Sequence, residues 1–155
     1  MNISVNMQTG NYINYMIQRY IQSDYSPLIE IWKQSVIHTH DFLSKEDYEL
    51  ILSKLPEYFS SVDMYVYRKE SRIAAFMGVS GNKMEMLFCH PDYIRQGIGS
   101  SMVKYAVQFL NIKYIDVNEQ NNKAVEFYKS QGFIVIGRQA HDAFGYNMLH
   151  LMYSE

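Results

Sequence analysis

The sequence predicts a mixed α/β (α+β) fold, in which helices flank a central mixed sheet. At 155 residues the chain is long enough for one domain with a substantial core and too short for two ordinary domains. Apolar residues make up 48% and charged residues 19%, which is typical of globular rather than disordered chains. Helix-like and strand-like segments follow one another without repeats or linkers, so we expect one domain over residues 1–155. Residues 1–14, rich in Asn and Gln, are expected to be a loose arm or a short leading strand.

The first third of the chain predicts one strand and two helices. Residues 15–21 have strand character. Ser26 followed by Pro27 predicts a helix start, because serine is a favoured N-cap and proline fits the first helical position. Ser44 and Asp47 resemble a capping box and predict a second start. Apolar stripes at helical spacing follow, with Leu28, Ile31, Trp32 and Ser35 in the first helix and Tyr48, Ile51, Leu52 and Leu55 in the second.

The rest of the chain predicts a hairpin followed by alternating strands and helices. Short apolar segments bounded by turn residues indicate strands, and apolar residues spaced three or four apart indicate helices. The expected elements are strands at 63–70, 72–81 and 83–90, a helix at 99–111, a strand at 113–117, a helix at 121–131, and strands at 133–140 and 146–153. This order predicts a mixed sheet of about six to seven strands.

Charge and cysteine content exclude several classes of protein. The formal net charge is −2, so no basic field favours nucleic acid or an anionic membrane, and we expect neither as a partner. Cys89 is the one cysteine, which excludes an internal disulfide and a Cys-rich zinc site. No apolar run approaches the ~18 residues of a membrane span, and the first residues lack the pattern of a signal peptide. We therefore expect a cytoplasmic protein.

Two glycines lie at the predicted junction between the strand at 83–90 and the helix at 99–111. The stretch reads "FCHPDYIRQGIGSSMV", with Gly97 and Gly99 one residue apart. A helix N-terminus presents unpaired N–H groups and partial positive charge, which suit a phosphate, and glycine lets the phosphate approach the backbone. The pattern suggests a diphosphate-binding loop, but by itself it is equally compatible with a simple tight turn. It lacks the Lys-Ser/Thr of a P-loop and the full Gly-x-Gly-x-x-Gly of a dinucleotide site.

A second segment, residues 117–133, reads "VNEQNNKAVEFYKSQGF". Together with the glycine loop it resembles the GNAT superfamily of acyl-CoA N-acyltransferases. The family motif Asn-x-x-Ala-x-x-Phe-Tyr-x-x-x-Gly-Phe is matched without a gap by Asn121, Ala124, Phe127, Tyr128, Gly132 and Phe133. Two motifs at the right separation make the resemblance specific over roughly residues 60–140.

The resemblance has a closer part and one departure. "HTHDFLS" at 38–44 and "DVNEQN" at 116–121 are similar to a bacterial YjaB-like subgroup of the family. The family loop pattern Arg/Gln-x-x-Gly-x-Gly/Ala begins here with Ile94, and the arginine follows at Arg95. This departure weakens a side-chain contact from position 94, and it leaves phosphate binding mostly to backbone amides.

The resemblance implies the GNAT fold and a site for acetyl-CoA as co-substrate, without a metal. The fourth and fifth strands, 83–90 and 113–117, would splay apart into a V-shaped slot for the pantetheine arm. The implied cofactor-binding residues are Leu87, Phe88 and Cys89 on the strand, Arg95, Gln96, Gly97, Ile98, Gly99 and Ser100 at the glycine loop, and Asn121 and Tyr128 in the second motif.

The implied reaction is direct attack by a primary amine on the thioester, within a ternary complex. Tyr128 matches the family tyrosine that protonates the leaving sulfur, and a phenol with an ordinary pKa of about 10 is protonated at neutral pH. A core aromatic beside Phe127 is the alternative. Asn121 would bond the cofactor arm or cap its helix, and a strand N–H near Cys89 would bind the oxyanion. Cys89 itself is expected to be a bystander, because no paired base is evident for an acyl-cysteine.

The proton acceptor and the acceptor pocket are less defined. Glu85 is one candidate base, since strict alternation would place residues 85, 87 and 89 on one face of the strand. His38 and His40 are others, at the end of the first helix where the family shapes its acceptor pocket. Trp32 could line that pocket or simply fill the core, and the pair His141-Asp142 could add to its wall or mark a bulge. A zinc reading of His-x-His lacks a third ligand at a convincing spacing.

The predicted function is thus an acetyl-CoA-dependent N-acetyltransferase. The acceptor would be a small-molecule amine or an amine of a peptide or protein. A homodimer is compatible with the sequence, which specifies no interface. A catalytically silent acyl-CoA-binding or sensing module with the same fold is the main alternative. A nucleotide-binding α/β domain is a third interpretation.

Overall fold

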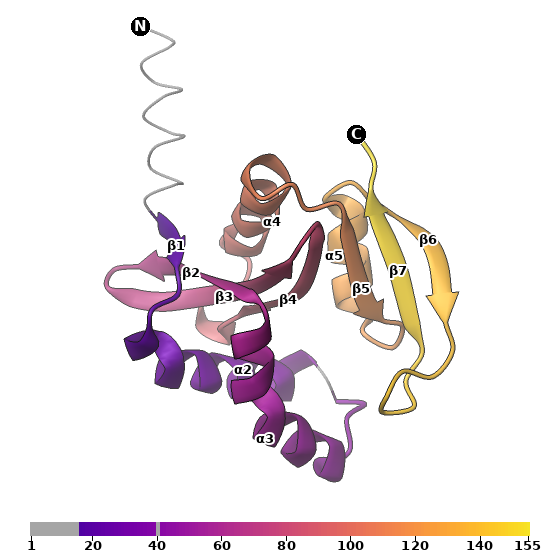
Figure 1. Ribbon diagram of the computed structural model, residues 1–155, viewed down its shortest axis with the longest axis horizontal. Coiled ribbons are helices and arrows are strands. Elements are labelled where there is room, and N and C mark those ends of the chain that lie inside the picture. Colours follow the sequence, from indigo (N-terminus) through magenta and orange to yellow (C-terminus); the bar gives the residue numbers. More distant parts are fainter. Residues whose placement is uncertain (1–15, 40) are drawn as a thin grey trace, which may run out of the picture.

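The computed structural model describes residues 16–39 and 41–155, and within them seven strands form one sheet in the order β1-β2-β3-β4-β5-β7-β6 (Figure 1). The strands are β1 (Ile17–Arg19), β2 (Asp63–Lys69), β3 (Arg72–Ser80), β4 (Lys83–Cys89), β5 (Tyr114–Asn118), β6 (Phe133–Gln139) and β7 (Met148–Tyr153). Neighbours in this sheet are antiparallel except β4 and β5, which are parallel. The predicted mixed α/β class is confirmed. The predicted arm at 1–14 lies outside the described residues.

Helices cover both faces of the sheet. They are α2 (Tyr25–Thr39), α3 (Lys45–Ser61), α4 (Ile98–Phe109) and α5 (Asn122–Ser130), with short 3₁₀ turns η1 (Gln22–Asp24) and η2 (Pro91–Tyr93). An apolar cluster lies between the sheet and the helices on each of its two faces. Phe76 of β3 packs with residues of α2 and α3, whereas its neighbour Met77 packs with residues of α4 and α5, because successive strand residues point to opposite faces.

Helix starts follow capping chemistry in one predicted case and not in the other. The Oγ of Ser44 accepts a hydrogen bond from the N–H of Asp47 at 3.1 Å, as expected for an N-cap. The predicted N-cap at Ser26 is wrong, because α2 already begins at Tyr25, directly after η1. The buried carboxylate of Asp24 stabilises η1 instead, since it accepts from the N–H of Ile21 at 3.0 Å and pairs with Arg68 at 2.9 Å.

The parallel strands β4 and β5 pair over only a short stretch. Their register covers Lys83 with Tyr114 and Met84 with Ile115, and further along the two strands are not paired. The predicted splay between the fourth and fifth strands is therefore confirmed. A bulge lies at the point of divergence, because Met84 and Met86 pair with adjacent residues of β3 and leave Glu85 as the extra residue.

The bulge changes which side chains share a face. Met84 and Leu87 both pack against the cluster under α4, although strict alternation would place them on opposite faces. The alternation argument that grouped Glu85 with Leu87 and Cys89 therefore does not hold across the bulge.

Candidate functional site

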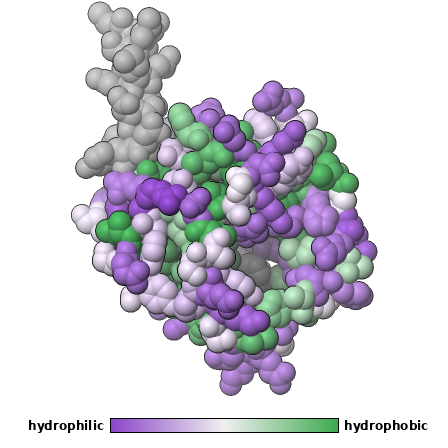
Figure 2. All heavy atoms as spheres, in the orientation of Figure 1, coloured by the Kyte–Doolittle hydropathy of each residue, from purple (hydrophilic) through white to green (hydrophobic). Residues whose placement is uncertain are grey.

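A cavity of about 600 Å³ lies between β4, the turn before α4, and α5. Its lining includes Leu87, Phe88, Cys89, Arg95, Gly97, Ile98, Gly99, Ser100, Asn121 and Tyr128, so it brings together every predicted cofactor-binding residue except Gln96. Figure 2 shows a hollow near the centre of one face, which in the matching view of Figure 1 lies between β4 and β5. We call this space the donor cavity.

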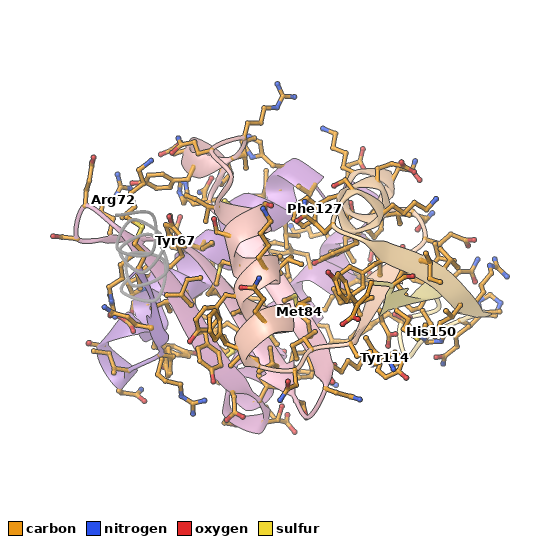
Figure 3. The ribbon with its side chains drawn as sticks, turned by 90° about the horizontal axis from the view of Figure 1, so that it is seen from above. Tyr67, Arg72, Met84, Tyr114, Phe127 and His150 are labelled. Carbon is orange, nitrogen blue, oxygen red and sulfur yellow. The ribbon has the colours of Figure 1, made fainter. Side chains whose placement is uncertain are left out.

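The two glycines of the loop are required for different physical reasons. Gly97 caps α4 with φ of 78°, a left-handed conformation that other residues rarely adopt. Gly99 lies inside the helix, and a Cβ there would approach the ring of Phe127 to 3.3 Å, so its absence leaves room for this side chain of α5 beside α4 (Phe127 is labelled in Figure 3). The glycines therefore form the turn and the helix contact that shape this end of the donor cavity.

The N-terminus of α4 borders the donor cavity with residues 97–100. The first hydrogen bond of the helix runs from the N–H of Ser101 to the carbonyl of Gly97 at 3.0 Å. The N–H groups of Ile98, Gly99 and Ser100 precede it and so have no partner within the helix. Together with the helix dipole they make a donor set that fits a diphosphate.

The side chains of the glycine loop offer fewer free hydrogen-bond donors to the donor cavity than its backbone does. Gln96 donates to the carbonyl of Asp92 at 3.3 Å and accepts from Lys69, and its side chain does not line the donor cavity. The hydroxyl of Ser100 donates to Gln131 Oε1 at 2.9 Å. Ile94, which stands where the family pattern has Arg or Gln, is half exposed at the rim.

The backbone of β4 presents an open edge to the slot. The N–H of His90 donates to the carbonyl of Ala74 on β3 at 2.8 Å. Because hydrogen-bonding direction alternates along an antiparallel strand, the groups of Phe88 also face β3, while those of Leu87 and Cys89 face the slot. An extended amide chain lying in the slot could bond to these groups as an additional strand.

A second cavity of about 310 Å³ adjoins the first. Its walls come from α2, α3, β4, β5 and the loop before β7, and include Trp32, Phe42, Tyr58, Glu85, Asp116, Asp142, Phe144 and Tyr146. Leu87, Phe88, Asn121, Ala124 and Tyr128 line both cavities. We call this smaller space the acceptor cavity. Of the predicted acceptor residues, Trp32 lines it, His38 lines the donor cavity instead, and His40 lies outside the described residues.

Tyr128 lies where the two cavities meet. Its side chain is 8% exposed and packs against the rings of Phe127 and Phe133, with centroid distances of 5.1 and 6.0 Å. Burial raises the pKa of the phenol far above its ordinary value, so Tyr128 remains a proton donor across the physiological range. Asn121 caps α5 by accepting from the N–H of Ala124 at 3.2 Å. The core-aromatic and N-cap alternatives are thus real, and both residues also border the cavities.

A hydrogen bond joins the loop before β7, which lines the acceptor cavity, to the start of α3. The hydroxyl of Tyr146, in the loop before β7, donates to Asp47 Oδ2 at the start of α3 at 2.5 Å. The ring of Tyr146 also meets Phe42 edge-on at 5.9 Å. The bond to Asp47, followed by burial, raises the pKa of Tyr146. Tyr146 is not predicted from the sequence, because nothing local to the loop indicates that it reaches α3.

Three carboxylates border the acceptor cavity, and their surroundings differ. Asp142 Oδ1 accepts from the N–H groups of Phe144 and Tyr146 at 2.8 and 2.9 Å, so it shapes the loop. Asp116 pairs with Lys83 and with His150. Glu85 has a looser contact, 3.9 Å from Lys83 Nζ. Asp116 is likewise not predicted from the sequence, because its ion pair with Lys83 joins two different strands.

Cys89 is a poor nucleophile in this setting. Burial raises the pKa of its thiol to about 11. Since the reactive form is the thiolate, labelling at pH 8 by a disulfide reagent is expected to be about 100-fold slower in the folded chain than in urea. The rate of thiol release measured by absorbance checks this. Equal rates in both states would reopen the acyl-cysteine alternative.

Among the residues that the structure describes, no group of three or more His, Cys, Asp or Glu side chains converges in a way that could hold a metal ion. None of the described helices has the length and apolar character of a membrane span.

Comparison with known proteins now defines the class. Residues 60–135 match the family described as the acetyltransferase (GNAT) domain. The chain belongs to this family and is an enzyme of the N-acetyltransferase class, which confirms the resemblance read from its two motifs.

Individual members of the family are similar to this chain over most of its length. The chain is 39% identical over 144 residues to the peptidyl-lysine N-acetyltransferase YjaB of Salmonella typhimurium, covering 88% of this chain and 97% of that protein. The solution structure of apo YjaB from Escherichia coli has a TM-score of 0.77 at 35% identity, over 88% of this chain and 95% of the other. A PaiA N-acetyltransferase from Thermoplasma acidophilum, solved in complex with coenzyme A, shares the fold with a TM-score of 0.62 at 21% identity, over 88% of this chain and 98% of that one.

Proposed function

We propose that the chain transfers the acetyl group of acetyl-CoA to the side-chain amine of a lysine in a protein, with both substrates bound at once. The observation that carries this proposal is the meeting of two cavities at Tyr128. One is shaped and equipped for a diphosphate and an extended amide arm, and the other has apolar walls and carboxylates. The names of the YjaB relatives, which are peptidyl-lysine acetyltransferases, support a protein amine as acceptor.

Acetyl-CoA fits the donor cavity through the chain's backbone. The amides of Ile98, Gly99 and Ser100 would bind its diphosphate, and the open edge at Leu87 and Cys89 would bond the amides of its pantetheine arm. Arg95, at the cavity rim, adds positive charge. The related PaiA protein binds coenzyme A with the same fold, which supports this donor.

A lysine side chain fits the acceptor cavity by shape and charge. Trp32, Phe42 and Tyr146 offer apolar surface for the aliphatic stem. Three carboxylates line the cavity, and Glu85 offers negative charge for the ammonium, because Asp116 pairs with Lys83 and Asp142 accepts from two backbone N–H groups. A charged amine is not a nucleophile, so one of these groups must remove a proton before attack. We assign that role to Glu85, because it is the carboxylate of the three with the loosest contacts.

Transfer of the acetyl group then depends on the groups near Tyr128, which would stabilise the intermediate and protonate the leaving sulfur. The lone pair of the amine forms the new C–N bond at the thioester carbonyl, and the C–S bond breaks. An N–H on the slot edge of β4, from Leu87 or Cys89, would stabilise the negative oxygen in between. Glu85 would take one proton from the ammonium before attack and pass it to solvent. Tyr128 would give a proton to the departing sulfur, and the second proton that the nitrogen loses as the amide forms would restore the phenol, so that one proton is released in all. We place this reaction in the cytoplasm, a reducing compartment that suits a free cysteine.

Mass spectrometry of Nα-blocked peptides with one lysine each tests the proposal. Incubation of the full chain with acetyl-CoA and the peptides is expected to add one acetyl group to the lysine, with release of one thiol per acetyl group. Matched peptides with arginine in place of lysine should remain unmodified. Tight binding of coenzyme A without turnover on any lysine peptide or small amine would contradict the proposal and favour a silent acyl-CoA-binding module.

A further inference from the structure

Four titratable side chains lie in contact at the narrow end of the slot, where β4 and β5 stop pairing. Lys83 Nζ lies 3.9 Å from Glu85 Oε2 and forms an ion pair with Asp116. Asp116 Oδ1 lies 2.6 Å from Nδ1 of His150 on the neighbouring strand β7. Figure 3 labels His150 on β7 and Tyr114 on β5, the strands that carry the far half of this group. We call Lys83, Glu85, Asp116 and His150 the vertex cluster.

Lys83 is shared unequally between two carboxylates. It makes a direct hydrogen bond to Asp116 and only a long contact to Glu85. Burial opposes the charge of Lys83, but its bond to Asp116 and the charges of Asp116 and Glu85 outweigh burial and raise its pKa. Burial likewise opposes the charge of Asp116, and the hydrogen bonds to Lys83 and His150 outweigh it and lower the pKa of Asp116. Asp116 therefore remains ionised at neutral pH and retains Lys83.

We infer that Asp116 is a positioning residue for the acetyl-transfer reaction, which holds the ammonium of Lys83 away from the proton acceptor Glu85. This inference rests on the proposed role of Glu85. A cation in close contact with a carboxylate favours its ionised form and makes it a weaker base. Lys83, once released from Asp116, would move onto Glu85 and also occupy the place of the acceptor's ammonium. His150 of β7 is bonded to the other oxygen of Asp116 and so fixes the orientation of the carboxylate that holds Lys83.

The remaining groups around Glu85 do not replace Lys83 in this role. The described titratable groups that share the acceptor cavity with Glu85 are Tyr58 from α3, Asp116 from β5, Tyr128 from α5, and Asp142 and Tyr146 from the loop before β7. None of these carries a positive charge. Lys83, on the same strand as Glu85, supplies the nearby cation, and Asp116 decides where that cation lies.

The variant Asp116→Asn tests the inference in the full chain, with acetyl-CoA and an Nα-blocked lysine peptide. It keeps the shape of the side chain and removes its charge. We expect kcat/KM for the peptide to fall about tenfold, because a carboxylate in close contact with a cation is a weaker base, with an unchanged Kd for acetyl-CoA. The acid limb of the pH–rate profile should move to lower pH, because the released Lys83 would stabilise the ionised form of Glu85.

A second variant separates positioning from general structure. The double variant Lys83→Met with Asp116→Asn removes the cation as well as its holder, and we expect it to recover most of kcat/KM and the original acid limb. It also carries the test if Asp116→Asn alone fails to fold. The control Asp63→Asn, which breaks an exposed ion pair with Arg19 between β1 and β2 and lies in the lining of neither cavity, should behave as the wild type.

The outcomes distinguish this inference from the proposal on which it rests. Full activity and an unshifted pH profile in Asp116→Asn, beside a slow Glu85→Gln variant, would overturn the inference alone. A double variant as slow as Asp116→Asn would do the same. Full activity of Glu85→Gln would remove the assigned proton acceptor, and a wild-type chain that acetylates no lysine peptide would overturn the proposed function.

Discussion

Tyr128→Phe is expected to lower kcat for acetyl transfer by a factor on the order of 10²–10³, the range over which a positioned proton donor contributes. The substitution removes one hydroxyl and leaves the ring, so the packing against Phe127 and Phe133 is retained. The departing sulfur then has no protein group in this position to protonate it. The Kd for acetyl-CoA, measured by calorimetry, should change less than twofold, because the hydroxyl acts on the sulfur only as the C–S bond breaks.

Tyr153→Phe is the matched control for this prediction. Tyr153 contacts the same ring, Phe133, at a centroid distance of 5.5 Å, but it lines neither cavity. Its loss of a hydroxyl should leave kcat unchanged. Because burial raises the pKa of Tyr128, the phenol should also cause no fall in wild-type activity on the basic side of neutrality. Equal kcat for Tyr128→Phe and the wild type would show that Tyr128 is only a core residue.

Ser100→Asp is expected to raise the Kd for acetyl-CoA by a factor on the order of 10²–10³. The new carboxylate would lie among the first amides of α4, where it competes with the diphosphate and repels it. Like charges about 4 Å apart near a protein surface repel by about 4 kcal/mol, and screening by salt reduces this. An acidic residue in the first turn is favourable to a helix, so stability should not fall with affinity. Calorimetric titration and thermal unfolding measure the two effects separately.

Ser101→Asp provides the same charge one residue further along. Ser101 does not line the donor cavity, and its N–H is already bonded to the carbonyl of Gly97. We expect its Kd for acetyl-CoA to rise less than about fivefold, from long-range repulsion alone. Similar losses in both variants would indicate a general effect of charge, and wild-type affinity in Ser100→Asp would place the diphosphate elsewhere.

Local sequence patterns predicted much of the fold and the donor side of the site. The strand and helix segments were placed to within a few residues, because side-chain period is a property of neighbours in the chain. The Ser44 cap is correct for the same reason, since Asp47 lies only three residues away. The Ser26 cap is wrong because the chain is already helical before Ser26, in η1, where Asp24 is paired with Arg68 from a distant strand. That partner leaves no trace in the local pattern.

The acceptor side depended on contacts between distant segments. The bulge at Glu85 arises from the pairing of β4 with β3, and it cannot be read from the alternation of β4 alone. The bond from Tyr146 to Asp47 joins residues separated by 99 positions. The placement of His38 at the donor cavity follows from where α2 ends against the sheet, which its sequence does not reveal.

The sequence by itself determined the class of this protein. The glycine loop and the motif from Asn121 to Phe133 are each a continuous stretch of sequence. Phosphate binding by a helix N-terminus is a local property, so the glycine loop alone can indicate it. Only the tertiary structure decided how the acceptor amine would be handled. Lys83, Asp116 and His150 come from three different strands, and the charge that each feels is set by the others once the sheet brings them together. Electrostatic interactions depend on distance in space and not on separation along the chain, so this part of the site appears only in the folded protein.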